Sequence, residues 1–165
     1  MRVAIDIGRV MTAIDLVDRW DEEARQYRSS PPLDGCLEHI RRMVEKFGAE
    51  NVFVLSRVQR PEGAAANWDM LTEWKFWEIT GILPENTIVF VGSREDKSSH
   101  VRERGINAVI DDRYDCLEGM KNEGVWLIAF NPDLADWAFI EQLRSTRHCV
   151  DIVRDWSGVR DLLGL

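Results

Sequence analysis

Six short apolar runs recur along this chain, and longer stretches with helical periodicity separate them. The runs cover residues 3–7, 52–55, 87–91, 108–110, 125–130 and 149–153. Segments this short that are apolar on both faces are typical of parallel strands, because helices cover both sides of such a sheet. The pattern therefore predicts an α/β fold in which strands and helices alternate.

The stretches between these runs carry the spacing and the end signals of helices. After the first run, apolar residues recur at steps of three or four and define one helical face: Leu37, Ile40, Val44 and Phe47. Gly48 follows as a C-terminal stop. Further helices are expected over residues 63–79, 98–104, 134–143 and 158–163. Since crossovers between parallel strands are right-handed, we expect a doubly wound, Rossmann-like parallel sheet whose first five strands lie in the order 5-4-1-2-3.

The sequence RSSPP at residues 28–32 is the clearest break in this alternation. Two prolines cannot continue a helix, and serines favour turns. We therefore expect residues 11–33 to form a flap-like excursion between the first strand and the first core helix, with residues 14–27 as a candidate helix. A length of 165 residues fits one domain, so residues 1–165 are predicted to form a single α/β domain.

The charge balance of the chain excludes one broad class of function. Lys and Arg number 21 and Asp and Glu number 29, which gives a formal net charge of -8 at pH 7. A surface of this sign repels polyanions over most of its area. General nucleic-acid binding is therefore not expected.

Cysteine usage and hydropathy both favour a reducing, membrane-free compartment. The three cysteines, at positions 36, 116 and 149, include no C-x-x-C pair, so we expect buried reduced thiols rather than disulfides or a zinc site. No apolar run approaches the roughly 18 residues of a membrane-spanning helix. The first residues run directly into a strand pattern without the apolar region of a signal peptide. The expected location is cytoplasmic.

Polar and charged residues follow the predicted strands where each strand ends. Asp6 ends the first strand, Ser56 the second and the pair Asp111-Asp112 the fourth, while the third strand leads towards Lys97. In an open parallel sheet, functional groups gather at the carboxyl edge of the strands. A carboxylate nucleophile, acidic neighbours that hold magnesium, and hydroxyl and ammonium groups that bind phosphate oxygens are the parts of a phosphoryl-transfer site.

These residues stand in the order of motifs I to IV of the haloacid dehalogenase (HAD) superfamily of hydrolases, which the chain resembles over roughly residues 1–130. The segment FWEITGILPENTIVFVGSREDKSSHVRERGINAVIDDR, from Phe76 to Arg113, is particularly similar to nucleotidase-like members. Neither residues 11–33 nor residues 57–84 leave room for a large cap. The resemblance therefore implies a HAD-like core without a large cap.

The resemblance also implies a chemistry and a set of roles. It implies magnesium-dependent phosphoryl-ester hydrolysis through an aspartyl intermediate on Asp6, with Ser56 and Lys97 orienting and neutralising the phosphoryl group. The residues implied to hold Mg²⁺ are Asp6, Gly8 through its carbonyl, Asp111 and Asp112. Because a site without a cap is open, we expect a phosphorylated small molecule or a larger phosphate-bearing substrate, and a second copy of the chain could cover the site in a homo-oligomer.

Motif I departs from the family pattern. The family has Asp-x-Asp, whereas this chain reads Asp6-Ile7-Gly8. The second aspartate serves as the general acid and base, a role that contributes about 10² to 10⁴ in rate. Two hypotheses follow: a hydrolase that is weak because Gly8 replaces the acid, in which Gly8→Asp would raise alkyl-ester hydrolysis, and a catalytically inactive HAD-like binding or regulatory protein.

Several of these residues also have an ordinary structural interpretation. Arg9 and Arg57 are candidate substrate contacts, but Arg9 could instead pair with Asp111 or Asp112, and Arg57 could be a surface arginine. Lys97 lies in the sequence SREDKSS, which is typical of a solvated run of charges. The D-x-G sequence also resembles the phosphate loop of sugar kinases and actin-like ATPases, and RNase H-like resolvases begin with a similar strand. Neither alternative accounts for Ser56 and Lys97 in this order.

Overall fold

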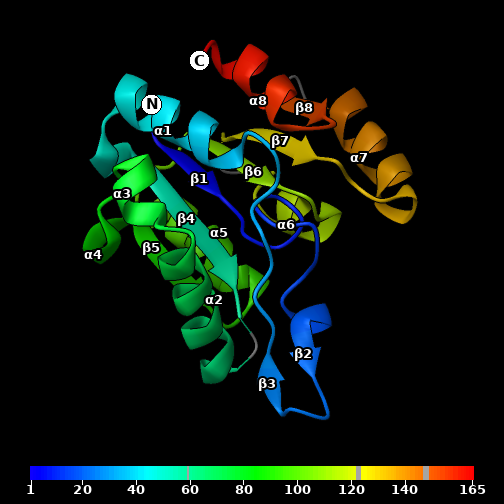
Figure 1. The fold of residues 1–165 in the computed structure, drawn as a ribbon. Coiled ribbons are helices and arrows are strands. Elements are labelled where there is room, and N and C mark those ends of the chain that lie inside the picture. Colours follow the sequence, from blue (N-terminus) through cyan, green and yellow to red (C-terminus); the bar gives the residue numbers. More distant parts are fainter. Residues whose placement is uncertain (59, 122–123, 147–148) are drawn as a thin grey trace.

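A computed structural model describes the chain from residue 1 to 165, except for residues 59, 122–123 and 147–148 (Figure 1). Its main sheet has six strands in the order β5-β4-β1-β6-β7-β8, and all neighbours in it pair in parallel. The strands are β1 (Val3–Ile5), β4 (Val52–Arg57), β5 (Ile88–Val91), β6 (Ala108–Asp111), β7 (Trp126–Phe130) and β8 (Val150–Val153). The predicted order of the first five strands is confirmed, and β8 extends the sheet beyond β7.

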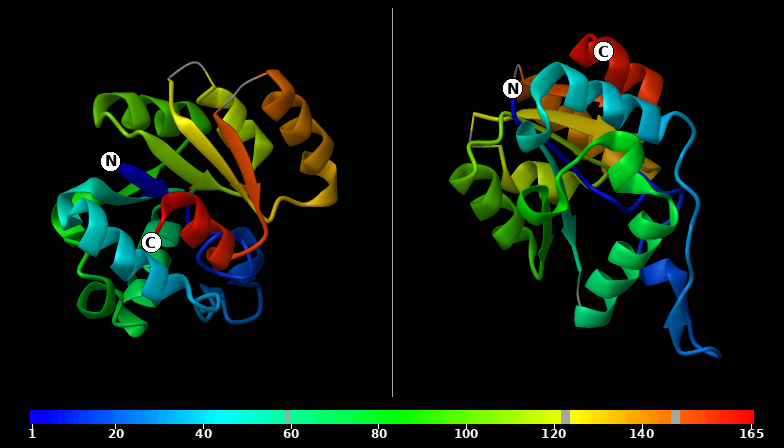
Figure 2. Two further views of the ribbon diagram at one scale, coloured as in Figure 1. Left: turned by 90° about the horizontal axis from the view of Figure 1, so that it is seen from above. Right: turned by 60° about the vertical axis from the view of Figure 1, so that its left-hand side comes forward.

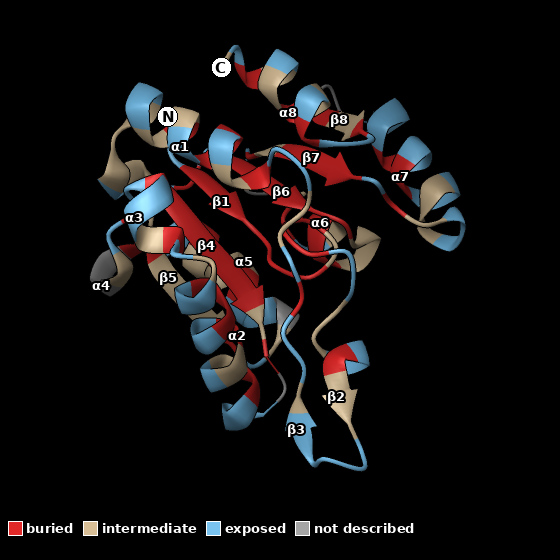
Figure 3. Cartoon of the chain, viewed as in Figure 1, coloured by how far each residue is buried: buried red, intermediate tan, exposed pale blue. Residues whose placement is uncertain are grey.

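Helices cover both faces of this sheet, as Figure 2 shows. They are α1 (Cys36–Phe47), α2 (Pro61–Glu73), α3 (Phe76–Thr80), α4 (Pro84–Thr87), α5 (Arg94–Glu103), α6 (Tyr114–Gly119), α7 (Leu134–Thr146) and α8 (Trp156–Leu163). One buried cluster joins the sheet to α1, α2, α3 and α8, and a second joins it to α5, α6 and α7. The central strands β4, β1, β6 and β7 are almost entirely buried between these layers (Figure 3), which explains why they are apolar on both faces. The edge strands β5 and β8 are only partly buried. The predicted doubly wound α/β fold is confirmed.

The single helix expected over residues 63–79 is wrong in one respect, because the structure divides it into α2 and α3. Lys75 stands between them with φ 53°, in the left-handed region. This turn lets Phe76 enter the core, where it is fully buried, while the indole N–H of Trp74 donates to the carbonyl of Ser30. Apolar spacing alone does not reveal such a break, since both helices present apolar residues to the same core.

The expectation of helix over residues 14–27 is largely wrong. Apart from the short 3-10 helix η1 (Val17–Arg19), this part forms a two-stranded antiparallel hairpin of β2 (Trp20–Asp21) and β3 (Gln26–Tyr27). The Asp21 carboxylate accepts hydrogen bonds from the backbone N–H groups of Glu23 and Ala24, which favours a turn over a helix. The rings of Trp20 and Tyr27 pack edge to face across the hairpin. In Figure 1 the hairpin projects beside α2, beyond the ends of the strands.

The expectations from composition have mixed outcomes. Within the described residues, no helix is both long and apolar enough to cross a membrane. The three cysteines are free, as predicted, but only Cys36 and Cys116 are buried, while Cys149 is partly exposed. Cys149 lies directly before β8, at an end of the strand rather than under a helix layer.

Candidate active site

The sheet topology brings the residues that end neighbouring strands to one edge. β1 lies between β4 and β6, with Ile5 aligned to Val54 on one side and to Ile110 on the other. Asp6 follows β1 and donates its backbone N–H to the carbonyl of Ile110 at 3.0 Å. The other sequence-predicted residues come from β4 (Ser56), from α5 after β5 (Lys97) and from the end of β6 (Asp111 and Asp112).

Lys97 connects two of these strand ends through buried ion pairs. Its Nζ lies 3.0 Å from Oδ1 of Asp6 and 2.6 Å from Oδ2 of Asp111. The Lys97 side chain is 2% exposed and that of Asp111 is fully buried. Burial alone would lower the pKa of the Lys97 ammonium, but Asp111 and Asp6 raise it well above its ordinary value. Lys97 is therefore a fixed positive charge beside Asp6, and not the solvated residue that its charged sequence suggests.

Asp6 and Asp111 form an acidic triad together with Asp112. Asp6, Asp111 and Asp112 each offer an oxygen, and these oxygens all lie within 4.8 Å of one another. Asp111 is already engaged, because one oxygen meets Lys97 and the other accepts the backbone N–H of Arg113 at 3.0 Å. Both oxygens of Asp112 are buried without a hydrogen bond, and burial next to Asp111 and Asp6 raises the pKa of Asp112 to about 8. A divalent cation would satisfy these hard oxygen ligands, so the residues present fit Mg²⁺.

A cavity of about 350 Å³ opens at this edge of the sheet. Four predicted residues with side-chain or backbone roles line it: Asp6, Gly8, Ser56 and Lys97. Arg57, predicted as a substrate contact, lines it too. Residues of the hairpin and of α2 complete the wall, so the segment 11–33 bounds the cavity next to the acidic triad.

Asp15 lies where a side chain at position 8 would be. A Cβ built on Gly8 would stand 2.5 Å from Oδ1 of Asp15, and Asp15 lines the same cavity as Asp6. Burial, and then the nearby Asp6 carboxylate, raise the pKa of Asp15 above its ordinary value. A larger residue at position 8 would therefore have to displace this carboxylate.

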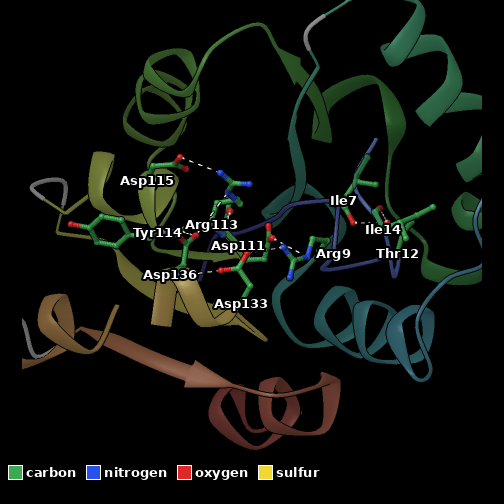
Figure 4. A network of polar contacts seen from close by, with 11 residues as sticks. Ile7, Arg9, Thr12, Ile14, Asp111, Arg113, Tyr114, Asp115, Asp133 and Asp136 are labelled. Atoms are coloured by element: carbon green, nitrogen blue, oxygen red, sulfur yellow. Dashed lines mark hydrogen bonds and ion pairs between the residues drawn. The ribbon is translucent and has the colours of Figure 1, made fainter. Parts of the chain in front are cut away.

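The loop after β1 folds back to bring Asp15 to this position. The backbone N–H groups of Met11 and Thr12 both donate to the carbonyl of Ile7, at 2.9 and 3.1 Å. The Thr12 hydroxyl then donates to the carbonyl of Ile14 at 2.7 Å, as Figure 4 shows. No short sequence motif predicts this return, because it depends on hydrogen bonds inside the loop, and so no pattern in the sequence points to Asp15.

Arg9 points to carboxylates rather than into the cavity. Its Nε lies 3.6 Å from Oδ2 of Asp112, and its Nη1 donates to Oδ2 of Asp133 at 3.2 Å (Figure 4). Among the described residues that line the cavity, Arg9 is absent. The pairing with Asp112 that the sequence left open is therefore found, and contact between Arg9 and a substrate stays a prediction.

Comparisons with known proteins bear on the fold. No protein-family model matches the chain, and no curated protein matches it. Among solved structures it is similar to D,D-heptose 1,7-bisphosphate phosphatase from B. bronchiseptica, complexed with magnesium and phosphate, with TM-score 0.64, 10% identity and coverage of 99% of this chain and 98% of that one. It is also similar to the enzyme of that name from Burkholderia thailandensis, with TM-score 0.60, 15% identity and coverage of 99% and 98%.

A third similar structure is a de novo designed Rossmann 3x3 fold protein, with TM-score 0.50, 12% identity and coverage of 99% and 93%. Identities of this size establish a shared fold and no more. The matches confirm the expected Rossmann-like architecture without a large cap. The chemistry has to be argued from the residues of this chain.

Proposed function

We propose that this protein is a HAD-type, magnesium-dependent hydrolase of phosphate esters that works through an aspartyl-phosphate on Asp6. One observation carries the proposal: the buried Lys97 ammonium bridges Asp6 and Asp111 next to the unsatisfied Asp112, at the wall of a cavity. A carboxylate nucleophile, a fixed cation and metal-ligating oxygens are the groups that phosphoryl transfer needs. The similar structure from B. bronchiseptica, named as a phosphatase with magnesium and phosphate, supports the proposal.

Each residue of the site has its own role in this reaction. The Asp6 carboxylate attacks phosphorus, and the bond from phosphorus to the ester oxygen breaks. Lys97 pairs with Asp6 and neutralises charge on the phosphoryl oxygens, while the Ser56 hydroxyl donates a hydrogen bond to one of them. Asp6 and Asp112, with the Gly8 carbonyl and Asp111, would hold Mg²⁺, which supplies further positive charge to the phosphoryl group. Water then cleaves the bond between Asp6 and phosphorus and releases phosphate.

Asp15 completes this scheme by taking the place of the missing acid. The departing ester oxygen must gain a proton, and the attacking water must lose one. A carboxylate two residues after the nucleophile does this in the family pattern, and Asp15 fills the space of that side chain beside Gly8. We therefore assign both proton transfers to Asp15. On this assignment, Gly8 does not make the enzyme weak.

Trapping the intermediate tests the proposed function. The protein is mixed with Mg²⁺ and an aryl phosphate, quenched in acid, and digested for mass spectrometry of the peptide that contains Asp6. We expect a phosphoryl group on Asp6 and release of the phenol, with Asp6→Asn abolishing both. Asp69→Asn, which changes an exposed carboxylate on α2, serves as the control and should retain both. Hydrolysis that survives Asp6→Asn would contradict the proposal.

The alternative function is a HAD-like protein that binds an anion or a partner without turnover. Gly8 favours it, because the usual acid is absent from motif I. This alternative predicts that magnesium and phosphate bind to the chain while no phosphate ester, aryl or alkyl, is cleaved.

A further inference from the structure

Four arginines line the cavity that Asp6 and Lys97 also line. Arg113 directly follows the acidic triad and pairs with Asp115 and Asp136. The other three come from three separate segments. Arg19 ends η1 at the start of the hairpin, Arg57 ends β4, and Arg60 is the N-cap residue of α2. All three line the cavity. In a chain with a formal net charge of -8, composition does not explain this accumulation of positive charge.

Arg19 is the most constrained of the three, because it is 1% exposed and its hydrogen-bond partners among the described residues are neutral. Its Nε donates to the carbonyl of Arg28 at 2.7 Å, its Nη1 to Oδ1 of Asn67 at 2.8 Å and its Nη2 to the carbonyl of Ala66 at 3.4 Å. Burial lowers the pKa of this guanidinium. A buried cation without a counter-charge is costly, and an anion in the cavity would offset that cost.

Arg57 and Arg60 reinforce this positive region from the surface. In the part of the chain that the structure describes, neither forms an ion pair, and Arg60 is exposed. Among the described carboxylates that line the cavity, Asp6 and Asp15 belong to the catalytic end, and the exposed Glu22 is the one that remains. The arginine region therefore keeps a positive net charge.

We propose that these arginines bind a second anionic group of the substrate, a phosphate or a carboxylate, so that the protein selects phosphate esters that carry two anions. The proposal rests on the proposed function, since Asp6 defines the end where the ester is cleaved. A cavity of about 350 Å³ suits a sugar-sized molecule. Trp20 and Tyr27, which also line the cavity, offer ring surface to the apolar face of such a molecule.

Three esters of similar size test this preference. Glucose 6-phosphate carries no second anion, 6-phosphogluconate adds a carboxylate, and glucose 1,6-bisphosphate adds a phosphate. We expect kcat/KM to be about tenfold higher, or more, for at least one of the two-anion esters, which is the size of a charge-assisted hydrogen bond. Comparing 6-phosphogluconate with glucose 1,6-bisphosphate then shows whether the second anion is a carboxylate or a phosphate. Arg60→Ala, with Arg57→Ala as a second variant, should bring the ratio of kcat/KM for the two-anion ester to that for glucose 6-phosphate close to one. Arg41→Ala, on the exposed face of α1, should leave this ratio unchanged.

A binding experiment separates this proposal from the proposed function. If no ester is hydrolysed, the proposed function fails, and calorimetry in EDTA then measures the affinity of the same three esters. We expect at least one two-anion ester to bind about tenfold more tightly, and Arg60→Ala to remove the difference. Equal affinities for all three esters, or a difference that survives both arginine variants, would overturn the proposal. Arg19 would then serve only to hold the hairpin against α2.

Discussion

Moving a carboxylate between positions 15 and 8 probes the proton-transfer step directly. Removing it with Asp15→Ala should lower kcat/KM for alkyl phosphates by about 10² to 10⁴, or about 2.7 to 5.4 kcal/mol of transition-state stabilisation. Aryl phosphates should lose much less, because a good leaving group needs little protonation. Asp34→Ala, an exposed carboxylate outside the cavity lining, is the matched control and should leave both ester classes unaffected.

The geometry reverses the expectation that the sequence raised for Gly8→Asp. The new Cβ would lie 2.5 Å from Oδ1 of Asp15, closer than the 3.0 Å below which neighbouring atoms must shift. Asp15 would then have to move, and two carboxylates would compete for one space. We therefore expect the single variant to lose alkyl-ester activity, and Gly8→Asp combined with Asp15→Ala to recover much of it.

The assay is steady-state hydrolysis of one alkyl and one aryl phosphate with Mg²⁺, accompanied by a thermal melt of each variant to verify folding. If a folded Asp15→Ala variant hydrolyses both ester classes with the same kcat/KM as the unchanged protein, the proposed role of Asp15 is refuted. A gain of activity in Gly8→Asp alone would show instead that position 8 was vacant.

Substitutions, pH and magnesium should also change the stability of the protein in ways that test the site. Lys97→Met should destabilise the fold by about 3–5 kcal/mol in denaturant titration, because it leaves the Asp6 and Asp111 carboxylates buried without their cation. In EDTA, the melting temperature should fall as pH rises from about 4 to about 8, because the folded state holds a proton on Asp112 that the unfolded state has lost, and Asp112→Asn should flatten this slope. Magnesium should raise the melting temperature more at pH 8 than at pH 5.5, and Asp112→Asn should remove that difference. Lys75→Gly should stabilise the protein by about 1 kcal/mol in the same titration, since glycine adopts φ 53° without strain.

Strands and strand ends were predictable because their signals are local. Runs such as residues 52–55 are apolar on both faces only when helices cover both sides of a sheet, so they indicate the fold class and, with the handedness rule, the strand order. Asp6, Ser56 and Asp111 then share an edge by topology alone. The closeness of Lys97 to Asp6 is also predictable, because both lie at this edge of the sheet. The burial of the Lys97 side chain is not predictable, because the sequence around it is strongly charged.

The features that the sequence did not predict depend on contacts between distant or irregular segments. Asp15 reaches Gly8 only because the loop turns back on the carbonyl of Ile7. Arg19, at the end of η1, is held at the cavity by a hydrogen bond to Asn67 of α2, which lies 48 positions away in the sequence. The sequence does not predict the hairpin, since its strands have two residues each, too few to show an alternation of apolar and polar residues.

A structure of the protein with Mg²⁺ and a beryllium fluoride mimic of the phosphoryl group tests the central claim most directly. The account predicts the mimic on the Asp6 carboxylate, in contact with Lys97 and Ser56, with the metal ion held by Asp6 and Asp112. A mimic bound elsewhere in the cavity, or a metal ion that avoids Asp112, would contradict it.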